Sequence, residues 1–345
     1  MANIRVLIVD DSALIRKMLT QVLGNAAGIE VVGVASDPII ARDKIKQLNP
    51  DVLTLDVEMP RMNGIQFLGN LMRLRPMPVV MVSTLTAAGA PVTLEALEIG
   101  ALDYIAKPQM DNEKSFNAFS KALIEKVRMA AGAKVRPLKH VHEVRFTPPP
   151  EGACSKFSRW VVLGASTGGT EAIKTVLGQV PANCPPILIT QHIPAVFSAS
   201  FAKRLDSSCA PEVLEASEGL EVRPGRVIVA HGDHHLTFRA EGNQVHCCLS
   251  PAAPVNRHRP SVEVMFDSIT AVKPAQELVA VMLTGMGADG AAAMKRLHQS
   301  GSRTIAQDEA SSVVYGMPKA VVDLQAADKV MALEKIAPLM MKMAE

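Results

Sequence analysis

The stretch "RWVVLGASTGGTEAIKTVLG", which begins at Arg159, places a serine among closely spaced glycines. It reads as a strand, a glycine turn and a helix, and Gly164, Ser166 and Gly168 fulfil the pattern G-x-S-x-G. A serine on such a turn stands at the rim of a sheet, where its hydroxyl can act as a nucleophile. The same glycines also resemble a loop that holds the phosphates of a dinucleotide. The first interpretation predicts an enzyme with a nucleophilic serine, and the second predicts a dinucleotide-binding protein.

A nucleophilic serine needs a base, and the base needs a carboxylate to orient it. His192 ends the next apolar run, "PILITQHI", and adjacent parallel strands would bring it to the same rim as Ser166. "LTGMGADG" supplies Asp289 at another strand-to-helix junction. Asp289 could equally cap the helix that follows it, a role worth about 1 kcal/mol, and His192 could be an ordinary strand-end histidine. The order serine, histidine, aspartate differs from that of α/β-hydrolases, which argues against a standard lipase or esterase.

The dinucleotide interpretation has one further feature in its favour. Tyr315 lies four residues before Lys319, the spacing found in short-chain dehydrogenases. Against it, Thr170 stands where a third glycine is expected, and Gln191 stands near the end of the second strand instead of an acid for the ribose. Pro318 would also interrupt the helix that must align the tyrosine with the lysine.

Two other patterns could bind a metal. The segment "HGDHH", from His231 to His235, lacks the i, i+4 histidine pair of zincins, so we expect a loop on the substrate side with His235 pointing to solvent. The five cysteines are odd in number and show no C-x-x-C spacing. The sequence therefore predicts neither a disulfide framework nor a structural zinc site.

Near the N-terminus, three carboxylates and a lysine follow apolar runs. Asp10 and Asp11 follow the first run, Asp56 ends the third, and Lys107 follows the fifth. Because ligands bind at the carboxyl ends of parallel strands, we expect these side chains to converge. Three carboxylates close together favour a hard cation such as Mg²⁺, which would also neutralise a phosphoryl group transferred to Asp56. Taken singly, Asp11 could merely cap a helix and Lys107 could be solvated.

The elements that position these residues follow from hydrophobic periodicity. From Ile4 to about Met129, five short apolar runs alternate with amphipathic helical stretches, which predicts a parallel sheet covered on both faces. Strand-like runs resume after it, and "LTFRAEGNQVHCCLS" looks like a hairpin turning at Glu241 to Gln244. The later runs are "RWVVLGA", "PILITQHI", "EVLEA", "GRVIVAHG", "LVAVMLTG" and "RTIAQ".

The fold class is therefore α/β, with two doubly wound parallel-sheet domains. We expect an N-terminal domain over 1–128, a linker over 129–156 that contains three consecutive prolines, and a larger C-terminal domain over 157–345.

With 48% apolar and 20% charged residues, the composition is that of a soluble globular protein. No apolar run reaches the roughly 18 residues of a spanning helix, and the N-terminus lacks a signal-peptide pattern, so we expect a cytoplasmic protein that is not itself a membrane protein. A net charge of +2 gives no indication of nucleic-acid binding.

Residues 1–128 resemble the receiver domain of response regulators. The resemblance is carried by "VDDS" from Val9, "LDVEMPRMNG" from Leu55, "MVS" from Met81 and "YIAKP" from Tyr104. It implies a flavodoxin-like fold and phosphorylation by a histidine kinase. By the same resemblance, the phosphorylated residue is Asp56, the Mg²⁺ ligands are Asp10, Asp11 and Asp56, and the switch residues are Ser83, Tyr104 and Lys107.

The whole chain resembles the chemotaxis response-regulator protein-glutamate methylesterases. Four motifs occur in order: "GASTGG" from Gly164, "QHIP" from Gln191, "HRPSVEVMF" from His258 and "LTGMGADG" from Leu283. The resemblance implies a Rossmann-like catalytic domain that hydrolyses glutamate methyl esters on chemoreceptors and deamidates receptor glutamines. Ser166, His192 and Asp289 would then be the catalytic triad, with the backbone N–H of Met286 stabilising the oxyanion and no cofactor for the ester chemistry.

Two further expectations depend on this resemblance, and one alternative stands against it. His258 and Arg259 are expected to line the groove that receives the receptor helix. Phosphorylation of Asp56 is expected to activate the enzyme, as it would if the receiver covers the rim that carries Ser166. The non-enzymatic alternative is a response regulator whose second domain only binds a partner; the sequence shows no helix-turn-helix with a basic recognition face.

Overall fold

The structure is a computed structural model that describes residues 3–59, 62–84, 90–108, 113–133, 135 and 157–345. The chain forms two compact units, residues 1–141 and 142–345. Of the predicted linker, 129–156, residues 134 and 136–156 lie outside the described residues. Helix α5 (Glu113–Gly132) continues four residues past the predicted end of the first domain at 128.

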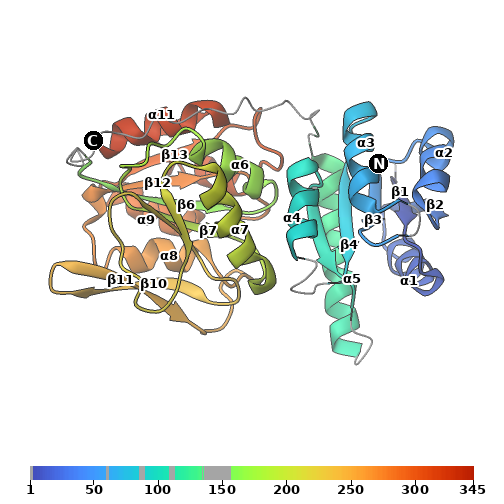
Figure 1. Ribbon diagram of the computed structural model, residues 1–345, viewed down its shortest axis with the longest axis horizontal. Coiled ribbons are helices and arrows are strands. Elements are labelled where there is room, and N and C mark those ends of the chain that lie inside the picture. Colours follow the sequence, from blue (N-terminus) through green and yellow to red (C-terminus); the bar gives the residue numbers. More distant parts are fainter. Residues whose placement is uncertain (1–2, 60–61, 85–89, 109–112, 134, 136–156) are drawn as a thin grey trace. The chain divides into compact units, whose positions relative to one another are not determined.

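The first unit is built on a five-stranded parallel sheet with the order β2-β1-β3-β4-β5 (Figure 1). This is the doubly wound order of flavodoxin-like folds, and it confirms the predicted fold class. The five predicted apolar runs all form strands. Their bounds are β1 (Ile4–Val9), β2 (Ile29–Ala35), β3 (Val52–Asp56), β4 (Val79–Ser83) and β5 (Asp103–Ala106).

The first three helices of this unit are each preceded by a residue whose side chain accepts hydrogen bonds from the first helical turn. Ser12 accepts from the N–H of Ile15, and Asp37 accepts from the N–H groups of Ile39 and Ile40. Such caps satisfy backbone donors that have no partner inside the helix. Besides α5, the helices are α1 (Ala13–Gly24), α2 (Pro38–Leu48), α3 (Gly64–Leu74) and α4 (Ala90–Ile99).

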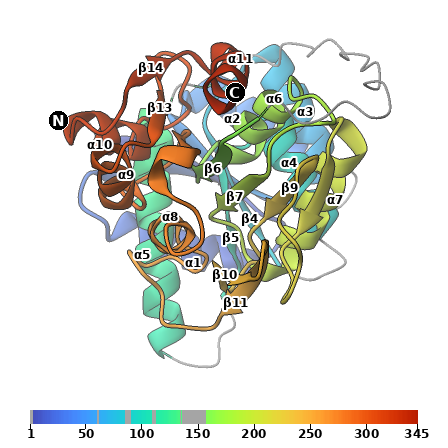
Figure 2. The same ribbon diagram turned by 90° about the vertical axis from the view of Figure 1, so that its left-hand side faces the viewer.

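The second unit contains a seven-stranded parallel sheet with the order β14-β13-β12-β6-β7-β9-β8 (Figure 2). All six predicted runs form strands of this sheet. The seventh strand, β14, was not predicted. The bounds are β6 (Trp160–Ala165), β7 (Ile187–Gln191), β8 (Glu212–Glu215), β9 (Arg226–Val229), β12 (Leu278–Met282), β13 (Arg303–Gln307) and β14 (Lys329–Met331).

Helices cover both faces of this sheet. In Figure 1, α6 and α11 lie on one side of the central strands, and α8 and α9 lie on the other. The predicted hairpin is confirmed: β10 (His235–Glu241) and β11 (Gln244–Ser250) pair antiparallel, and β10 packs against α8. The remaining bounds are α6 (Gly169–Leu177), α7 (Ala195–Ser208), α8 (Val262–Ile269), η1 (Ala275–Glu277), α9 (Ala291–Gln299), α10 (Met317–Asp323) and α11 (Leu333–Ala344).

The central strands carry the core. Every residue of β7 and β12 is buried, as near-continuous apolar runs predict for a parallel sheet covered on both faces. Across the described residues, no helix combines the length and apolar character that a membrane crossing requires.

Candidate active site

Ser166 and His192 occupy equivalent positions at the ends of two neighbouring strands. In the register of β6 and β7, Ala165 pairs with Gln191, so each candidate residue directly follows a paired one. The N–H of His192 continues the ladder by donating to the carbonyl of Ala165 at 3.1 Å. The prediction that adjacent parallel strands bring Ser166 and His192 to the same rim is therefore confirmed.

The rim lies where the strand order of the second sheet reverses. From β6 the chain proceeds to β7 on one side, and β12 later pairs with β6 on the other side. A crevice at such a reversal is where open α/β sheets bind ligands. The loop 283–290, which follows β12, brings Asp289 to this rim.

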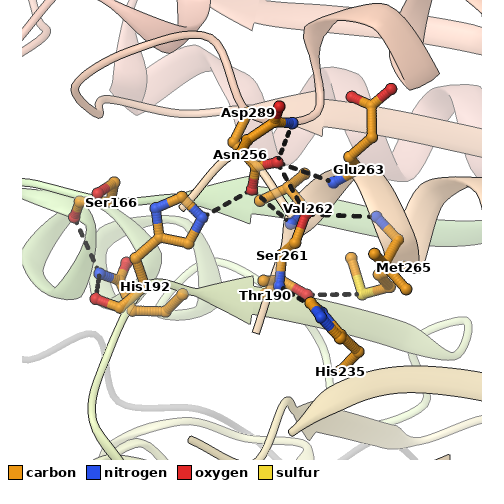
Figure 3. Close-up of polar contacts among 12 residues, drawn as sticks. Ser166, Thr190, His192, His235, Asn256, Ser261, Val262, Glu263, Met265 and Asp289 are labelled. Atoms are coloured by element: carbon orange, nitrogen blue, oxygen red, sulfur yellow. Dashed lines mark hydrogen bonds and ion pairs between the residues drawn. The ribbon is translucent and has the colours of Figure 1, made fainter. Parts of the chain in front are cut away.

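The imidazole of His192 lies between Ser166 and Asp289 (Figure 3). Its Nε2 is 2.8 Å from Oδ2 of Asp289, and both side chains are buried. A carboxylate can only accept, so Nε2 carries the proton and Nδ1 presents a lone pair. Nδ1 is buried and has no hydrogen-bond partner among the described residues. The ring is therefore in the tautomer that accepts a proton on the side of Ser166.

Asp289 does not cap the helix that follows it. The N-cap of α9 is Gly290, which makes no side-chain hydrogen bond. The carboxylate instead accepts from the start of α8, taking the N–H of Val262 at 2.7 Å and the hydroxyl of Ser261 at 2.8 Å. It also accepts from Nδ2 of Asn256 at 2.8 Å.

These donors control the charge of Asp289. Burial of the carboxyl opposes ionisation, but the hydrogen bond with His192 and those from Asn256 and Ser261 outweigh it, and the pKa of Asp289 falls to about 2. The group is therefore ionised at any working pH. Asn256 and Ser261 were not singled out in the sequence, although Ser261 lies within "HRPSVEVMF".

The turn that carries Ser166 is held from both neighbouring strands. Nε2 of Gln191 donates to the carbonyl of Ser166 at 2.9 Å, and the N–H of Ser166 donates to the carbonyl of Thr284 at 3.0 Å. The hydroxyl of Thr284 reaches the carbonyl of Thr167 at 3.0 Å. Gly168, the residue before α6, has a φ of 73°, which a glycine adopts without strain.

Met286 lies on a loop that is fixed through its neighbour Gly285. The N–H of Gly285 donates to Val314, and the carbonyl of Gly285 accepts from the N–H groups of Gly316 and Met317 at 3.1 and 2.8 Å. A Cβ atom on Gly285 would lie 2.8 Å from Cβ of Ser166, so the loop approaches the serine more closely than a larger residue permits. Gly285, the residue before Met286, therefore contacts Ser166 closely, and the oxyanion role of the Met286 N–H stays a prediction.

The residues that suggested a dehydrogenase, Tyr315 and Lys319, and the histidine His235 of the possible metal site take other positions in the structure. Helix α10 begins at Met317, after Tyr315, and Lys319 forms an ion pair with Asp323. The expectation that His235 points to solvent is wrong. Its side chain is buried, with Nε2 3.1 Å from the carbonyl of Ala253 and Nδ1 accepting from the N–H of Ser261.

His258 and Arg259, predicted to line a groove, make specific contacts within the second unit. The ring of His258 stacks on that of His192, with centroids 3.7 Å apart and planes 7° from parallel. Nε of Arg259 donates to Asp233 at 3.0 Å, and its Nη1 donates to the carbonyl of Pro251 at 2.9 Å. His258 therefore lies against the candidate base, whereas Arg259 braces neighbouring loops.

The predicted phosphorylation site in the first unit also assembles at strand ends. Nζ of Lys107 lies 2.7 Å from Oδ2 of Asp56 and 2.9 Å from Oδ2 of Asp10. Oxygen atoms of Asp10, Asp11 and Asp56 lie within 4.8 Å of one another. Asp11 is exposed and does not cap α1, because Ser12 does.

Burial and the charge of Asp10 raise the pKa of Asp56 to about 6, against the opposing hydrogen bond from Lys107. Burial disfavours the charge on Lys107, but hydrogen bonds to Asp56 and Asp10 outweigh it and raise the pKa of the lysine. The cluster thus holds more negative charge than one ammonium group compensates. Oxygen donors with such an excess of charge fit a hard divalent cation such as Mg²⁺.

Of the predicted switch residues, Lys107 belongs to this cluster, and Ser83 and Tyr104 lie on the next two strands of the sheet. Ser83 ends β4, the strand beside Asp56, and is buried; its carbonyl accepts from the N–H of Lys107 at 2.9 Å. Tyr104 lies on β5, and burial followed by the charge of Asp103 raises the pKa of its phenol well above the usual value. Nζ of Lys126 lies 5.9 Å from the centre of the Tyr104 ring.

Comparison with known proteins gives matches along both units. A family model for the CheB methylesterase matches residues 161–340, and a model for the response regulator receiver domain matches residues 6–117. The chain is 51% identical to the protein-glutamate methylesterase/protein-glutamine glutaminase 2 of Saccharophagus degradans, over 100% of this chain and 99% of that protein. It is 49% identical to protein-glutamate methylesterase/protein-glutamine glutaminase 1 of Dechloromonas aromatica, over 96% of each.

A solved structure supports the same relationship for the second unit. The crystal structure of the Thermotoga maritima CheB methylesterase catalytic domain superposes with a TM-score of 0.52 and 37% sequence identity. The match covers 54% of this chain and 98% of that one.

Proposed function

The chain belongs to the CheB methylesterase family, and from this premise we propose that it hydrolyses methyl esters of glutamate side chains on chemoreceptors and deamidates receptor glutamines. As a member of this family it is a carboxylic-ester hydrolase with a receiver domain. We assign the chemistry to Ser166, His192 and Asp289. The observation that carries the assignment is the buried Nδ1 of His192, which has no hydrogen-bond partner in the described part of the chain and faces Ser166, while Nε2 is bound to Asp289.

The proposed reaction begins with proton transfer from the hydroxyl of Ser166 to Nδ1 of His192. Oγ of Ser166 attacks the ester carbonyl, and the imidazolium that forms is stabilised by the ionised Asp289. Collapse of the tetrahedral intermediate returns the proton from Nδ1 to the leaving oxygen, and methanol departs. Water then attacks the acyl-enzyme, giving its proton to the same nitrogen, which passes it back to Ser166. The product is a glutamate carboxylate.

Backbone N–H groups at the rim support charge development in this reaction. The N–H of Met286 and those of the turn after Ser166 are proposed to stabilise the oxyanion. Removing one such donor in other hydrolases costs about 10²- to 10³-fold in kcat. An amide substrate follows the same path and releases ammonia, but the leaving group is poorer and the reaction slower.

The test of this proposal is methanol release from receptor-containing membranes whose glutamates carry labelled methyl groups. Ser166→Ala is expected to lose at least about 10³-fold in turnover. Ser207→Ala is the matched control, because Ser207 is an exposed serine on α7, and it is expected to retain wild-type turnover. If neither the wild type nor the control released methanol, the second unit would be an adaptor; a dehydrogenase would instead bind a nicotinamide cofactor.

We also propose that the receiver domain regulates the esterase. A histidine kinase phosphorylates Asp56, and Ser83, Tyr104 and Lys107 relay the change, so that turnover rises. The ion pair between Lys107 and Asp56 supports this assignment, since the lysine is placed to contact a phosphate oxygen. Asp10, Asp11 and Asp56 are the residues that would hold Mg²⁺, which supplies charge neutralisation during phosphoryl transfer.

A cytoplasmic location is part of the proposal. The described cysteines Cys184, Cys209, Cys247 and Cys248 are all free. Burial raises the pKa of Cys184 and of Cys247 to about 12, so these two thiols remain neutral and unreactive. Free thiols of this kind are typical of a reducing compartment.

A further inference from the structure

A tight turn between the hairpin and α8 passes both His192 and Asp289. Val255 and His258 pair with each other through N–H···O bonds of 3.1 and 2.9 Å, which closes the turn. Its two central residues have positive φ, 50° at Asn256 and 69° at Arg257. An arginine rarely adopts this conformation, and such backbone persists only where surrounding contacts determine it. Two residues of this turn contact the candidate acid and base: Asn256 donates to Asp289, and the ring of His258 stacks on that of His192.

Asn256 completes the hydrogen bonding of the carboxylate. Oδ1 of Asp289 accepts from Nδ2 of Asn256 and from Oγ of Ser261, each at 2.8 Å. Oδ2 accepts from the N–H of Val262 at 2.7 Å and from Nε2 of His192 at 2.8 Å. A third, longer bond from the N–H of Glu263 reaches Oδ1 at 3.4 Å, so each oxygen has at least two donors. Because the donors on Oδ1 fix the rotation of the carboxylate, they also fix where Oδ2 lies relative to the imidazole.

His258 provides the second constraint on the base. The bond from Nε2 to Asp289 fixes one point of the His192 ring but leaves its plane free to tilt. The stacked ring of His258, 3.7 Å away and nearly parallel, fixes that plane and covers one face of the imidazole. Together the two contacts keep Nδ1 directed toward Ser166.

We propose that Asn256 and His258 are positioning residues for the proton transfer between Ser166 and His192, the first acting through Asp289 and the second through the ring of the base. The inference rests on the proposed triad. Neither residue supplies or accepts the transferred proton. Their loss misplaces Nδ1, and a misplacement of about 1 Å at a reacting centre costs about 10²-fold in rate.

The test measures kcat and KM of the full chain for methanol release from methylated receptor membranes. His258→Ala is expected to lower kcat by about 10- to 100-fold with KM unchanged within about twofold. His258→Phe keeps a flat ring and is expected to recover most of kcat. Asn256→Ala is expected to lower kcat by about tenfold. Asn243→Ala, at the exposed tip of the hairpin formed by β10 and β11, is the control and is expected to change neither kcat nor KM.

Several results would overturn the positioning role. The first is a wild-type kcat in His258→Ala and Asn256→Ala. The second is a rise in KM alone, which would make His258 a groove residue. The third is an equal loss of kcat in His258→Phe and His258→Ala. If His258→Ala does not fold, His258→Leu fills the space without a planar ring, and a wild-type kcat there overturns the proposal. Ser166→Ala in the same assay separates the two levels: turnover in that variant overturns the triad as well, whereas its loss beside unaffected positioning variants overturns this inference alone.

Discussion

Nε2 of His192 lies 2.8 Å from Oδ2 of Asp289, while Nδ1 of the same ring faces Ser166. The carboxylate therefore selects the tautomer of the base. Asp289→Asn removes the charge and lets the amide donate to the ring, so the proton moves to the wrong nitrogen. We expect kcat for methanol release to fall by about 10⁴-fold. Asp267→Asn, on the exposed side of α8, is the control; a loss below tenfold in Asp289→Asn would contradict the assignment.

The depressed pKa of Asp289 predicts a pH dependence of stability. With a folded pKa of about 2 and an ordinary value of 3.8, the ionised carboxylate stabilises the fold above pH 3.8, and this contribution is lost as the pH falls toward 2. It amounts to about 2 kcal/mol. The difference in free energy of unfolding between the wild type and Asp289→Asn should shrink by about 1 kcal/mol between about pH 5 and pH 3 in urea titrations. A difference that does not change with pH would show that Asp289 is not stabilised as an anion.

Gly285→Ala should impair the esterase through steric contact with the nucleophile. The new Cβ would lie 2.4 Å from Sδ of Met317, which can move, and 2.8 Å from Cβ of Ser166, which is fixed by its backbone. We expect kcat to fall at least about tenfold as Ser166 shifts. Gly24→Ala, where the added Cβ meets no atom within 4 Å, is the control. Equal kcat values in the two variants would show that the loop can retreat without affecting the serine.

Phosphorylation should require Mg²⁺, whereas the basal ester chemistry should not. With Mg²⁺ and a small phosphodonor such as acetyl phosphate, we expect the full chain to form a phosphoprotein and to release methanol faster. Chelation with EDTA or the substitution Asp56→Asn should remove the phosphoprotein and the stimulation together, leaving basal turnover intact. The phosphoryl group is transferred to a cluster of carboxylates, where a cation is needed to neutralise its charge. The proposed reaction of Ser166, His192 and Asp289 needs no cation.

A fragment that starts near Lys156 is the control for this regulation. It lacks Asp56, so its turnover should not respond to the phosphodonor. Equal stimulation of the fragment and the full chain would contradict regulation through the receiver domain.

The sequence predicted the strands and the rim they share because that information is local. Apolar runs mark buried parallel strands, and the residues at or just after the end of a run lie at the rim, as Ser166, His192 and Asp56 illustrate. Strand β14 was missed because it has only three residues, which pair with β13 alone and are largely exposed. Such a strand carries no alternating or continuous apolar pattern.

The support of the candidate site could not be predicted in the same way. Asn256 and Ser261 reach Asp289 across 33 and 28 residues of chain, and their contacts depend on how α8 docks beside the sheet. His235 was misplaced for a similar reason, because its partner Ser261 lies 26 residues further along. The motif "HRPSVEVMF" indicated that this segment matters for function. It did not indicate which residues its side chains contact.

The loop after β12 has a consequence for the order of events during folding. Ser166 and His192 come from consecutive strands of one sheet, whereas Asp289 arrives from 97 residues beyond His192 and only when β12 adds to the far side of β6. Half-formed molecules, in which the earlier strands have assembled alone, would be inert toward esters. With the proposed triad, the chain gains esterase activity only after β12 has paired with β6 and Asp289 has reached His192.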